Sequence, residues 1–569
     1  MALQLNTCVS KIQHLPVLSV HNLSISFQTT PAFEAVKNIS FAIEQGRTLA
    51  IVGESGSGKS VTAMSLMGLV PVIAQVSGDV SFSVDDKKYD LPRLDKKQWQ
   101  HIRGNEIAMV FQEPMTALNP VMKIGEQLCE CIQQHKKINK QQAKQLAIEW
   151  LGKVKLPAPE RLYNSYPHQL SGGQKQRVTI AMALCNAPSL IIADEPTTAL
   201  DVTVQQEIVK LMQQLQAEQG CAMIFITHDL ALAAEVADDI LVMYKGEMVE
   251  YGKMKDVLHH PQHAYTKALL ACRPNIKQKN TKLPVIADFL SDDPQALATH
   301  TWADTNTDTT LLEVKDLQVW FPENKNLFGK TTEYYKAVKG VSFNLKQGEV
   351  LGLVGESGCG KSTISKSLLG LLPVESGHII YNGKDLAAIN ATEWNQVRRD
   401  IQMIFQDPYA SLNPRIRIGD AIVEVLRVHN IVAASEYRAE AERLLSLVQL
   451  PADAYKRYPH QFSGGQRQRI GIARALAVRP KLLVCDESVS ALDVSVQAQV
   501  LNLLKELQSQ LGLSYLFISH DLSVVHYISD RVMVMRAGVL VEVGTANDVL
   551  QHPQNDYTRR LVNAVPGAR

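Results

Sequence analysis

The sequence predicts two α/β domains in tandem, each with a mostly parallel sheet core and an inserted helical subdomain. The segment GESGSGKS at 53–60 returns as GESGCGKS at 355–362, and the later motifs of the chain repeat in the same order. Short apolar runs such as LAIV and SLIIAD alternate with helix-like segments such as VQQEIVKLMQQLQAEQ. This alternation is typical of parallel sheets that bind ligands at their strand ends. Apolar residues spaced three and four apart within 121–165 and 415–458 predict the helical subdomains.

The repeat continues to the end of each unit. Matching residues lie 302 positions apart at the lysines of the repeated loop, 294 apart at Gln112 and Gln406, and 292 apart at Ser171 and Ser463. The first unit therefore has eight extra residues before Gln112 and two more before Ser171, in polar stretches of the kind that surface loops tolerate. The spacing of 292 then holds through the motifs HHPQHAYTKALL and QHPQNDYTRRLV.

These observations predict three segments. We expect a first domain over 17–274, a linker over 275–310 and a second domain over 311–566. The linker includes SDDPQALATHTWADTNTDTT, which is rich in Asp and Thr and has no helical or strand period. We expect it to be mildly acidic and mobile.

Composition excludes several classes of protein. The 58 Lys and Arg residues balance 57 Asp and Glu residues, so the net charge of +1 gives no sign of binding to nucleic acid or an anionic membrane. The chain has no apolar run of the roughly 18 residues that a membrane-spanning helix needs, and Cys8 has no apolar leader before it. The eight cysteines are scattered, which is typical of reduced thiols in the cytoplasm. Cys129 and Cys131 are the only close pair, and we expect helix positions there rather than a metal site.

The repeated loop Gly-x-x-x-x-Gly-Lys-Ser has the pattern of a phosphate cradle. Its glycines allow backbone N–H groups to turn inward, and the helix that follows directs its positive end at the anion. The lysines are expected to reach the terminal phosphates of a nucleotide, and the serines to hold Mg²⁺. The predicted binding residues are Gly53, Glu54, Ser55, Gly56, Ser57, Gly58, Lys59 and Ser60 in the first copy, and Gly355, Glu356, Ser357, Gly358, Cys359, Gly360, Lys361, Ser362 and Thr363 in the second.

A second repeated motif carries a family resemblance. LSGGQ at 170–174 and FSGGQ at 462–466 each place their serine 23 residues before an aspartate that ends an apolar run. Each resembles the signature of the ABC ATPases, and the resemblance covers nearly the whole chain. It implies that ATP and Mg²⁺ are the cofactors. It also implies that two units face each other head to tail, so that the phosphate loop of one works with the signature of the other. The signature residues are Ser171, Gly172, Gly173, Gln174, Ser463, Gly464, Gly465 and Gln466.

The remaining site residues follow from what ATP hydrolysis needs. A strand-end aspartate can hold the Mg²⁺ shell, and the glutamate after it can polarise the attacking water. A glutamine can contact both the metal and the water, and a histidine after a strand can bond the γ-phosphate. The expected catalytic residues are Glu195, Glu487, His228, His520, Gln112 and Gln406, and the expected metal ligands are Ser60, Gln112, Asp194, Ser362, Gln406 and Asp486. Phe27 and Phe321 end matching segments and either stack on adenine or pack in the core.

Further motifs indicate what the ATPase drives. EPMTALNP and DPYASLNP follow the two glutamines, and HPQHAYT and HPQNDYT follow the two sheets. They resemble segments of ATP-binding subunits of dipeptide, oligopeptide and nickel importers, and the fused arrangement and the block VWFPENKNLFGK are most like those of glutathione importers. The resemblance implies a peripheral protein at the cytoplasmic face of the inner membrane, which couples ATP hydrolysis to uptake of a small peptide such as glutathione. It implies two permease subunits and an extracytoplasmic binding protein as partners, with no nucleic acid.

Other classes of cargo and protein stay open. A dipeptide or oligopeptide importer is the nearest alternative. A soluble tandem ABC ATPase such as a translation factor is less favoured, because the linker is short and acidic rather than a basic helical arm. A DNA-repair ABC ATPase would carry Cys-x-x-Cys modules, which this sequence lacks. The first unit has Cys272 alone where related subunits carry a cysteine-rich tail, so no iron–sulfur cluster is expected. The sequence assigns no consequence to Met182, which stands where the second unit has Arg474.

Overall fold

The computed structural model describes most of the chain. The N-terminal stretch that contains Cys8 and much of the predicted linker lie outside the described residues. The described ranges are 16–29, 32–85, 87–198, 200–274, 281–290, 301–302, 307–325, 331–407, 409, 411–490 and 492–565. The chain divides into two compact units, residues 1–200 with 207–266, and residues 201–206 with 267–569.

The first unit has a parallel sheet at its centre. Strands β3, β7 and β8 are buried along their whole length, as expected for strands covered on both faces. They form the order β9-β3-β8-β7-β6 with all neighbours parallel, and β10 pairs antiparallel with β9. The strands are β3 (Thr48–Val52), β6 (Ile107–Val110), β7 (Leu190–Asp194), β8 (Ala222–Thr227), β9 (Asp239–Tyr244) and β10 (Glu247–Lys253). The predicted α/β fold with a mostly parallel core is confirmed.

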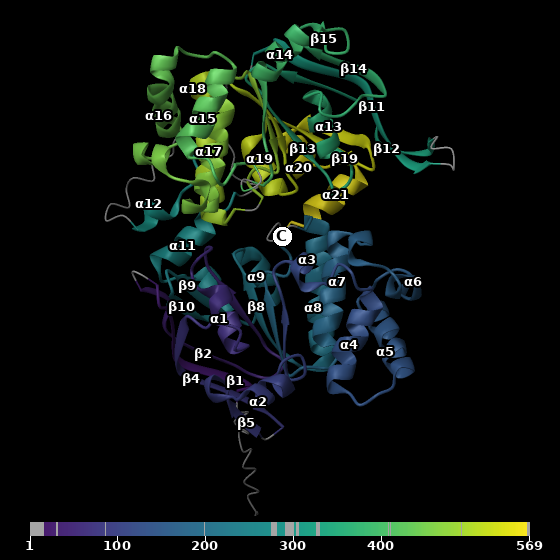
Figure 1. The fold of residues 1–569 in the computed structure, drawn as a ribbon, viewed down its shortest axis with the longest axis vertical. Coiled ribbons are helices and arrows are strands. Elements are labelled where there is room, and N and C mark those ends of the chain that lie inside the picture. The colour runs from purple at the N-terminus through teal and green to yellow at the C-terminus, as the bar shows by residue number, and fades with distance from the viewer. Residues whose placement is uncertain are drawn as a thin grey trace, which may run out of the picture. The chain divides into compact units, whose positions relative to one another are not determined.

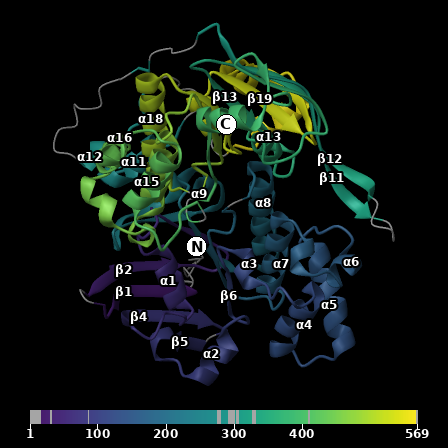
Figure 2. The same cartoon turned by 45° about the horizontal axis from the view of Figure 1, so that its top comes forward.

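Four antiparallel strands extend this sheet, and sequence reasoning did not anticipate them. Strand β1 pairs with both β2 and β4, and a parallel bridge between Glu247 and Lys37 joins them to the core. Figure 2 shows the four strands lying together near α1 (Lys59–Leu66). Their period-two pattern is interrupted by register shifts, one of them beside Asn22, whose φ of 50° lies in the left-handed region. The strands are β1 (Leu18–Phe27), β2 (Phe33–Ile43), β4 (Ala74–Val84) and β5 (Lys87–Asp90).

Helix α1 lies between these two parts of the sheet. Leu66 of α1 is completely buried in one cluster with Ile25 of β1 and Ile51 of β3. The phosphate-loop helix is therefore fixed by apolar contacts from both parts of the sheet, and burial of each such side chain contributes about 1.5–3 kcal/mol.

The predicted helical subdomain is present in the first half. Helices α4 (Ile124–His135), α5 (Lys140–Lys153) and α6 (Pro159–Tyr163) stand beside α7 (Figure 1) and fall within the expected range 121–165. The other helices of this half are α1 (Lys59–Leu66), α2 (Lys96–Ile102), α3 (Pro114–Ala117), α7 (Gly172–Leu184), α8 (Val202–Gln219), α9 (Leu230–Val236), α10 (Met254–His259) and α11 (Ala264–Ala271).

The second half repeats this architecture. A six-stranded sheet in the order β16-β17-β18-β13-β19-β20 and a four-stranded sheet in the order β12-β11-β14-β15 are present among its described residues. The strands are β11 (Thr310–Lys325), β12 (Thr331–Lys346), β13 (Val350–Val354), β14 (Ser376–Tyr381), β15 (Lys384–Asp385), β16 (Ile401–Ile404), β17 (Leu482–Asp486), β18 (Ser514–Ile518), β19 (Arg531–Arg536) and β20 (Val539–Thr545). The helices are α13 (Lys361–Leu368), α14 (Ala391–Asp400), α15 (Ile418–Val428), α16 (Tyr437–Leu447), α17 (Gly464–Leu476), α18 (Val494–Leu511), α19 (Leu522–Ile528), α20 (Ala546–Gln551) and α21 (Asp556–Asn563), and α15 and α16 form the predicted subdomain.

Part of the predicted linker contacts helix α18 of the second half. Helix α12 (Ile286–Leu290) is preceded by Leu283, which is buried. The backbone N–H of Leu283 donates a hydrogen bond to Asn502 Oδ1 at 3.0 Å, and Asn502 Nδ2 donates one to the carbonyl oxygen of Leu283 at 2.8 Å. Lys282 forms an ion pair with Glu506 at 3.3 Å. The side chain of Asn502 satisfies both backbone groups of Leu283, so this segment is held on α18.

None of the helices in the described ranges is both long enough and apolar enough to span a bilayer.

Candidate functional site

The two phosphate loops have a backbone that only glycine accommodates. Gly53, Gly56 and Gly58 have φ values of 154°, 78° and 101°. A Cβ atom on Gly53 would overlap the carbonyl oxygen of Met243, so a side chain is excluded there by space as well as by conformation. Helix α1 starts at Lys59, directly after this turn, so its free N–H groups face the loop. The second loop has the same φ values within 10° at Gly355, Gly358 and Gly360.

Each loop lysine is already held in its loop. The Nζ atom of Lys59 donates to the carbonyl oxygens of Gly53 and Glu54 at 2.7 and 2.8 Å, and the side chain is buried. Lys361 makes the matching bonds to Gly355 and Glu356 at 2.7 and 3.0 Å. These bonds hold each ammonium group inside the loop, where the phosphates of a nucleotide are expected.

A serine and an aspartate meet beside each lysine. Ser60 Oγ lies 3.1 Å from Asp194 Oδ1, and Ser362 Oγ lies 3.1 Å from Asp486 Oδ1. Burial raises the pKa of both aspartates, although the serine hydrogen bonds oppose the shift. A hard cation would compensate the buried carboxylate, and a hydroxyl and a carboxylate oxygen are ligands that Mg²⁺ accepts. Within the described ranges no group of three or more His, Cys, Asp or Glu side chains is arranged to hold a metal ion by itself.

The carboxylate of Glu195 contacts the other polar side chains of the first site. It lies just after β7 with a φ of 45°, and its carboxylate accepts hydrogen bonds from Gln112 Nε2 at 3.1 Å and Thr198 Oγ1 at 2.8 Å. His228 Nδ1 lies 3.4 Å from the same carboxylate. Burial acts to raise the pKa of Glu195, but the hydrogen bonds and the charge of His228 outweigh it and lower the pKa to about 2. The carboxylate therefore stays ionised, and its oxygens can orient a water.

Glu487 repeats this arrangement in the second site. Its φ is 48°, and its carboxylate accepts from Gln406 Nε2 at 2.7 Å and lies 3.6 Å from His520 Nδ1. Burial acts to raise the pKa of Glu487, but the interaction with His520 outweighs it and lowers that pKa. At His520, burial acts to lower the pKa, but the interaction with Glu487 outweighs it and raises that pKa. The structure thus brings the predicted glutamine and histidine onto the glutamate. Direct contact of either residue with metal or γ-phosphate stays a prediction.

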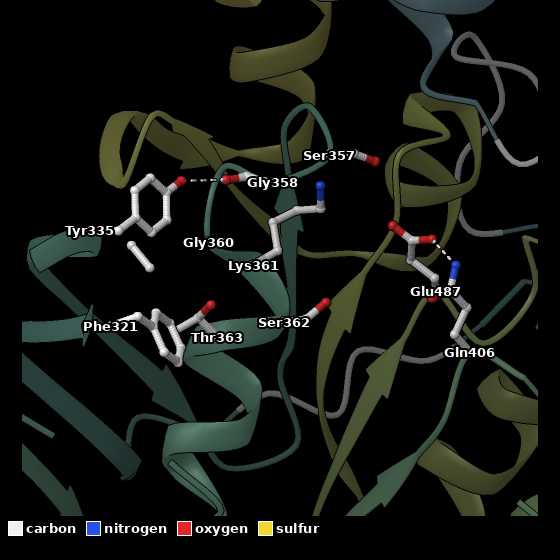
Figure 3. A pocket seen from close by; sticks show the side chains of 11 residues that line it. Phe321, Tyr335, Ser357, Gly358, Gly360, Lys361, Ser362, Thr363, Gln406 and Glu487 are labelled. Atoms are coloured by element: carbon white, nitrogen blue, oxygen red, sulfur yellow. Dashed lines mark hydrogen bonds between the residues drawn. The ribbon is translucent and has the colours of Figure 1, made fainter. Parts of the chain in front are cut away.

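A pocket over the second phosphate loop joins these groups to an aromatic pair (Figure 3). Phe321 and Tyr335 stand on one side, on paired positions of β11 and β12, and Glu487 and Gln406 stand on the other. Tyr335 donates to the carbonyl oxygen of Gly358 at 3.4 Å. The pocket is lined by Phe321, Tyr335, Ala337, Ser357, Gly358, Gly360, Lys361, Ser362, Thr363, Gln406 and Glu487.

Sequence reasoning named Phe321 but missed Tyr335. In the first unit Phe27 pairs in register with Phe33, which is the residue that matches Tyr335. Both of these aromatic side chains are exposed, Phe33 by 57% and Tyr335 by 51%. An aromatic residue at the same place of both repeats, Phe33 in β2 and Tyr335 in β12, was the available signal. The strand pairing that brings it opposite Phe27 or Phe321 was not readable from the sequence.

The signature residues form the start of a helix in each unit. Ser171 Oγ accepts from the Gln174 N–H at 3.3 Å, and Gln174 Oε1 accepts from the Ser171 N–H at 3.0 Å. Ser463 and Gln466 form the same capping box at 3.4 and 3.1 Å. Gly172 is exposed and Gly173 and Gly464 are half-buried, so an anion can approach the backbone N–H groups there, whereas Gly465 is buried.

Comparison with known proteins agrees with this geometry. Residues 36–198 and 338–490, which together exceed half of the chain, match the family model described as ABC transporter. The chain belongs to the ABC transporter family. Its two ABC units are ATP-binding ATPase domains, and residues 249–296 and 541–569 match the model described as oligopeptide/dipeptide transporter, C-terminal region.

Similar ABC proteins are known over almost the full length. The glutathione import ATP-binding protein GsiA of Escherichia coli O157:H7 is 48% identical over 559 residues, which cover 97% of this chain and 90% of the relative. The proteins of the same name from Escherichia coli K12 and Pectobacterium atrosepticum are 47% and 46% identical over the same shares.

Proposed function

We propose that this ABC protein is the ATP-hydrolysing subunit of a bacterial importer and that its cargo is a small peptide, glutathione. The observation that carries the proposal is the 48% identity over 97% of the chain to a glutathione import ATP-binding protein, together with two complete sets of site residues. A dipeptide or oligopeptide is the second candidate cargo, because the C-terminal segments match the oligopeptide/dipeptide transporter model.

The residues of each site divide the work of ATP hydrolysis. In the first site the loop N–H groups and Lys59 bind the phosphates. Ser60 and Asp194 would hold Mg²⁺, which would neutralise charge on the phosphates. Glu195 orients the attacking water and accepts its proton, and such a base contributes about 10²- to 10⁴-fold in rate. Gln112 reaches the same carboxylate from the end of β6, so a change at the nucleotide can move the segment after it.

The second site does the same with its matching residues, Lys361, Ser362, Asp486, Glu487 and Gln406. Phe321 and Tyr335 line the same pocket as the phosphate loop, which supports stacking of both rings on adenine. By resemblance to the ABC family, we propose that Ser463, Gly464 and Gly465 serve the nucleotide bound at Lys59, and that Ser171, Gly172 and Gly173 serve the one bound at Lys361.

Import requires further subunits. We propose two transmembrane permeases and an extracytoplasmic binding protein as partners, with this chain attached to the cytoplasmic face of the inner membrane. One chain then supplies both ATPase units of the transporter.

Uptake of labelled glutathione, with a labelled dipeptide beside it, tests the proposal in cells that lack the gene. Complementation by the wild type should restore glutathione uptake, whereas the Glu195→Gln/Glu487→Gln double variant should not, because neither site can activate water. The purified double variant should still bind ATP, since its phosphate loops are intact.

Each other outcome has a definite meaning. Restoration of dipeptide uptake alone would replace the cargo and keep the mechanism. Full ATPase activity in either single variant would contradict two equivalent catalytic glutamates, and uptake that does not depend on the gene would contradict an importer.

A further inference from the structure

A buried tyrosine near the end of each unit contacts the phosphate loop. Tyr265 lies in the first turn of α11 and is completely buried, and its hydroxyl oxygen accepts a hydrogen bond from the backbone N–H of Glu54 at 3.0 Å. The two residues are 211 positions apart in the chain. The tyrosine belongs to the motif HPQHAYT, and the roles proposed above leave that motif unexplained.

The second unit repeats the contact. Tyr557 lies in the first turn of α21, is buried, and accepts from the backbone N–H of Glu356 at 3.2 Å. Burial raises the pKa of Tyr557 to about 12, so the hydroxyl group is protonated and neutral at any physiological pH. An identical bond in two units of different sequence argues for a selected contact rather than an accident of packing.

The loop before the first tyrosine is fixed by a glutamate on β10. The carboxylate of Glu250 accepts from the N–H groups of Gln262 and His263 at 2.8 and 3.2 Å. His263 Nδ1 then accepts from the N–H of Tyr265 at 3.1 Å. These bonds hold the first turn of α11 and set the direction in which the tyrosine points.

The second unit builds the same support with a different side chain. Glu542 accepts from the N–H groups of Gln554 and Asn555 at 2.8 and 3.1 Å, and Asn555 Oδ1 accepts from the N–H of Tyr557 at 2.8 Å. Asparagine thus replaces histidine while an acceptor stays at the same place. The property that both units share is the position of the tyrosine hydroxyl.

The tyrosine bond acts on the peptide group that holds the loop lysine. The peptide between Gly53 and Glu54 offers its carbonyl oxygen to Lys59 Nζ at 2.7 Å and its N–H to the Tyr265 hydroxyl. The same peptide in the second loop, between Gly355 and Glu356, is held at its carbonyl end by Lys361 at 2.7 Å and at its N–H end by Tyr557. Because a peptide group is planar and rigid, fixing its N–H end also fixes the carbonyl that positions the lysine.

We propose that Tyr265 and Tyr557 are positioning residues for ATP binding, through which the C-terminal segment of each unit sets the orientation of the phosphate-loop peptide and of its lysine. The inference rests on the proposed function, because it takes Lys59 and Lys361 as phosphate ligands. The C-terminal segment of each unit then acts on the nucleotide through the loop peptide and its lysine.

The test uses Tyr265→Phe and Tyr557→Phe as single substitutions in the full chain. To prevent turnover, both are made in the Glu195→Gln/Glu487→Gln background. Phenylalanine keeps the ring and removes the acceptor. Equilibrium binding of labelled ATP should show a Kd raised about three- to tenfold at the altered site, the range expected for loss of one hydrogen bond, with two sites per chain retained. Tyr251→Phe is the matched control, because its 44% exposed ring carries a hydroxyl that bonds to Ala42 and not to a phosphate loop.

The number of sites separates positioning from a purely structural role. A Phe variant that binds fewer ATP molecules per chain, with an unchanged Kd at the sites that remain, would overturn the inference. A Phe variant whose Kd and number of ATP sites both match the control would also overturn it. The Lys59→Ala/Lys361→Ala variant distinguishes this failure from that of the proposed function. It should lose ATP binding whatever the tyrosines do, and retained binding would refute the phosphate loops and the tyrosine inference together.

Discussion

The two signature glycines of the second unit allow folding and function to be tested separately. Both lie in the first turn of α17. A Cβ atom on Gly464 would meet Leu492 Cδ2 at 3.8 Å, an ordinary van der Waals contact. A Cβ atom on Gly465 would overlap Val496 Cγ1. Alanine is therefore tolerated at the first position and excluded by side-chain packing at the second.

The magnitudes follow from these contacts. Gly464→Ala should leave stability unchanged or raise it, since alanine is favoured over glycine in a helix by about 0.5–1 kcal/mol. Gly465→Ala should cost about 1–3 kcal/mol, the usual effect of overpacking, which lowers the Tm of a unit of this size by about 2–12 °C. The ATPase activity of Gly464→Ala should nevertheless fall at least about tenfold, equivalent to about 1.4 kcal/mol, because the role proposed for the signature brings the nucleotide phosphates to the first turn of α17.

Calorimetry of the purified chain measures the first quantity, and ATPase activity with the permeases present measures the second. A Gly464→Ala variant as unstable as Gly465→Ala would refute the packing argument. A stable Gly464→Ala variant with wild-type ATPase activity would refute the role proposed for the signature.

Three further predictions concern other contacts. Arg474→Met should lower the Tm of the second unit by about 3–12 °C, because its guanidinium group donates to the carbonyl oxygen of Ser411 and a bond to a charged group contributes about 1.5–3 kcal/mol. Gly419→Ala should cost about 1–3 kcal/mol, measured by chemical denaturation, because its Cβ would overlap the ring of Tyr455. Glu195 has its pKa lowered from 4.5 to about 2, so its ionised form stabilises the folded state fully above pH 4.5 and progressively less as the pH falls toward 2. The Tm difference between wild type and Glu195→Gln should therefore shrink below pH 4.5.

Matched variants provide the controls. Met182→Leu changes the residue that matches Arg474 in the first unit and should leave Tm unchanged. Gly471→Ala should not destabilise, because no atom lies within 4 Å of the added Cβ. A Tm difference between wild type and Glu195→Gln that stays constant from pH 7 to pH 3 would contradict the lowered pKa of Glu195. An Arg474→Met variant with the wild-type Tm would show that the hydrogen bond to Ser411 contributes nothing to stability.

The sequence alone determined the features that depend on local chemistry. The glycines of 53–60 dictate a left-handed turn before a helix, and continuous apolar runs that end in Asp194 or Asp486 dictate buried strands with a carboxylate at the tip. Both the phosphate loop and the two-fold repeat were readable because each motif specifies its own backbone within a few residues.

Only the tertiary structure decided contacts between distant segments. It paired β1 with β4, set Gln112 on Glu195 across 83 residues, and placed Tyr265 against Glu54. It also paired the backbone of Leu283, in the predicted linker, with the side chain of Asn502. Strand register and buried hydrogen bonds depend on which surfaces the folded chain brings together, and no local period in the sequence records that choice.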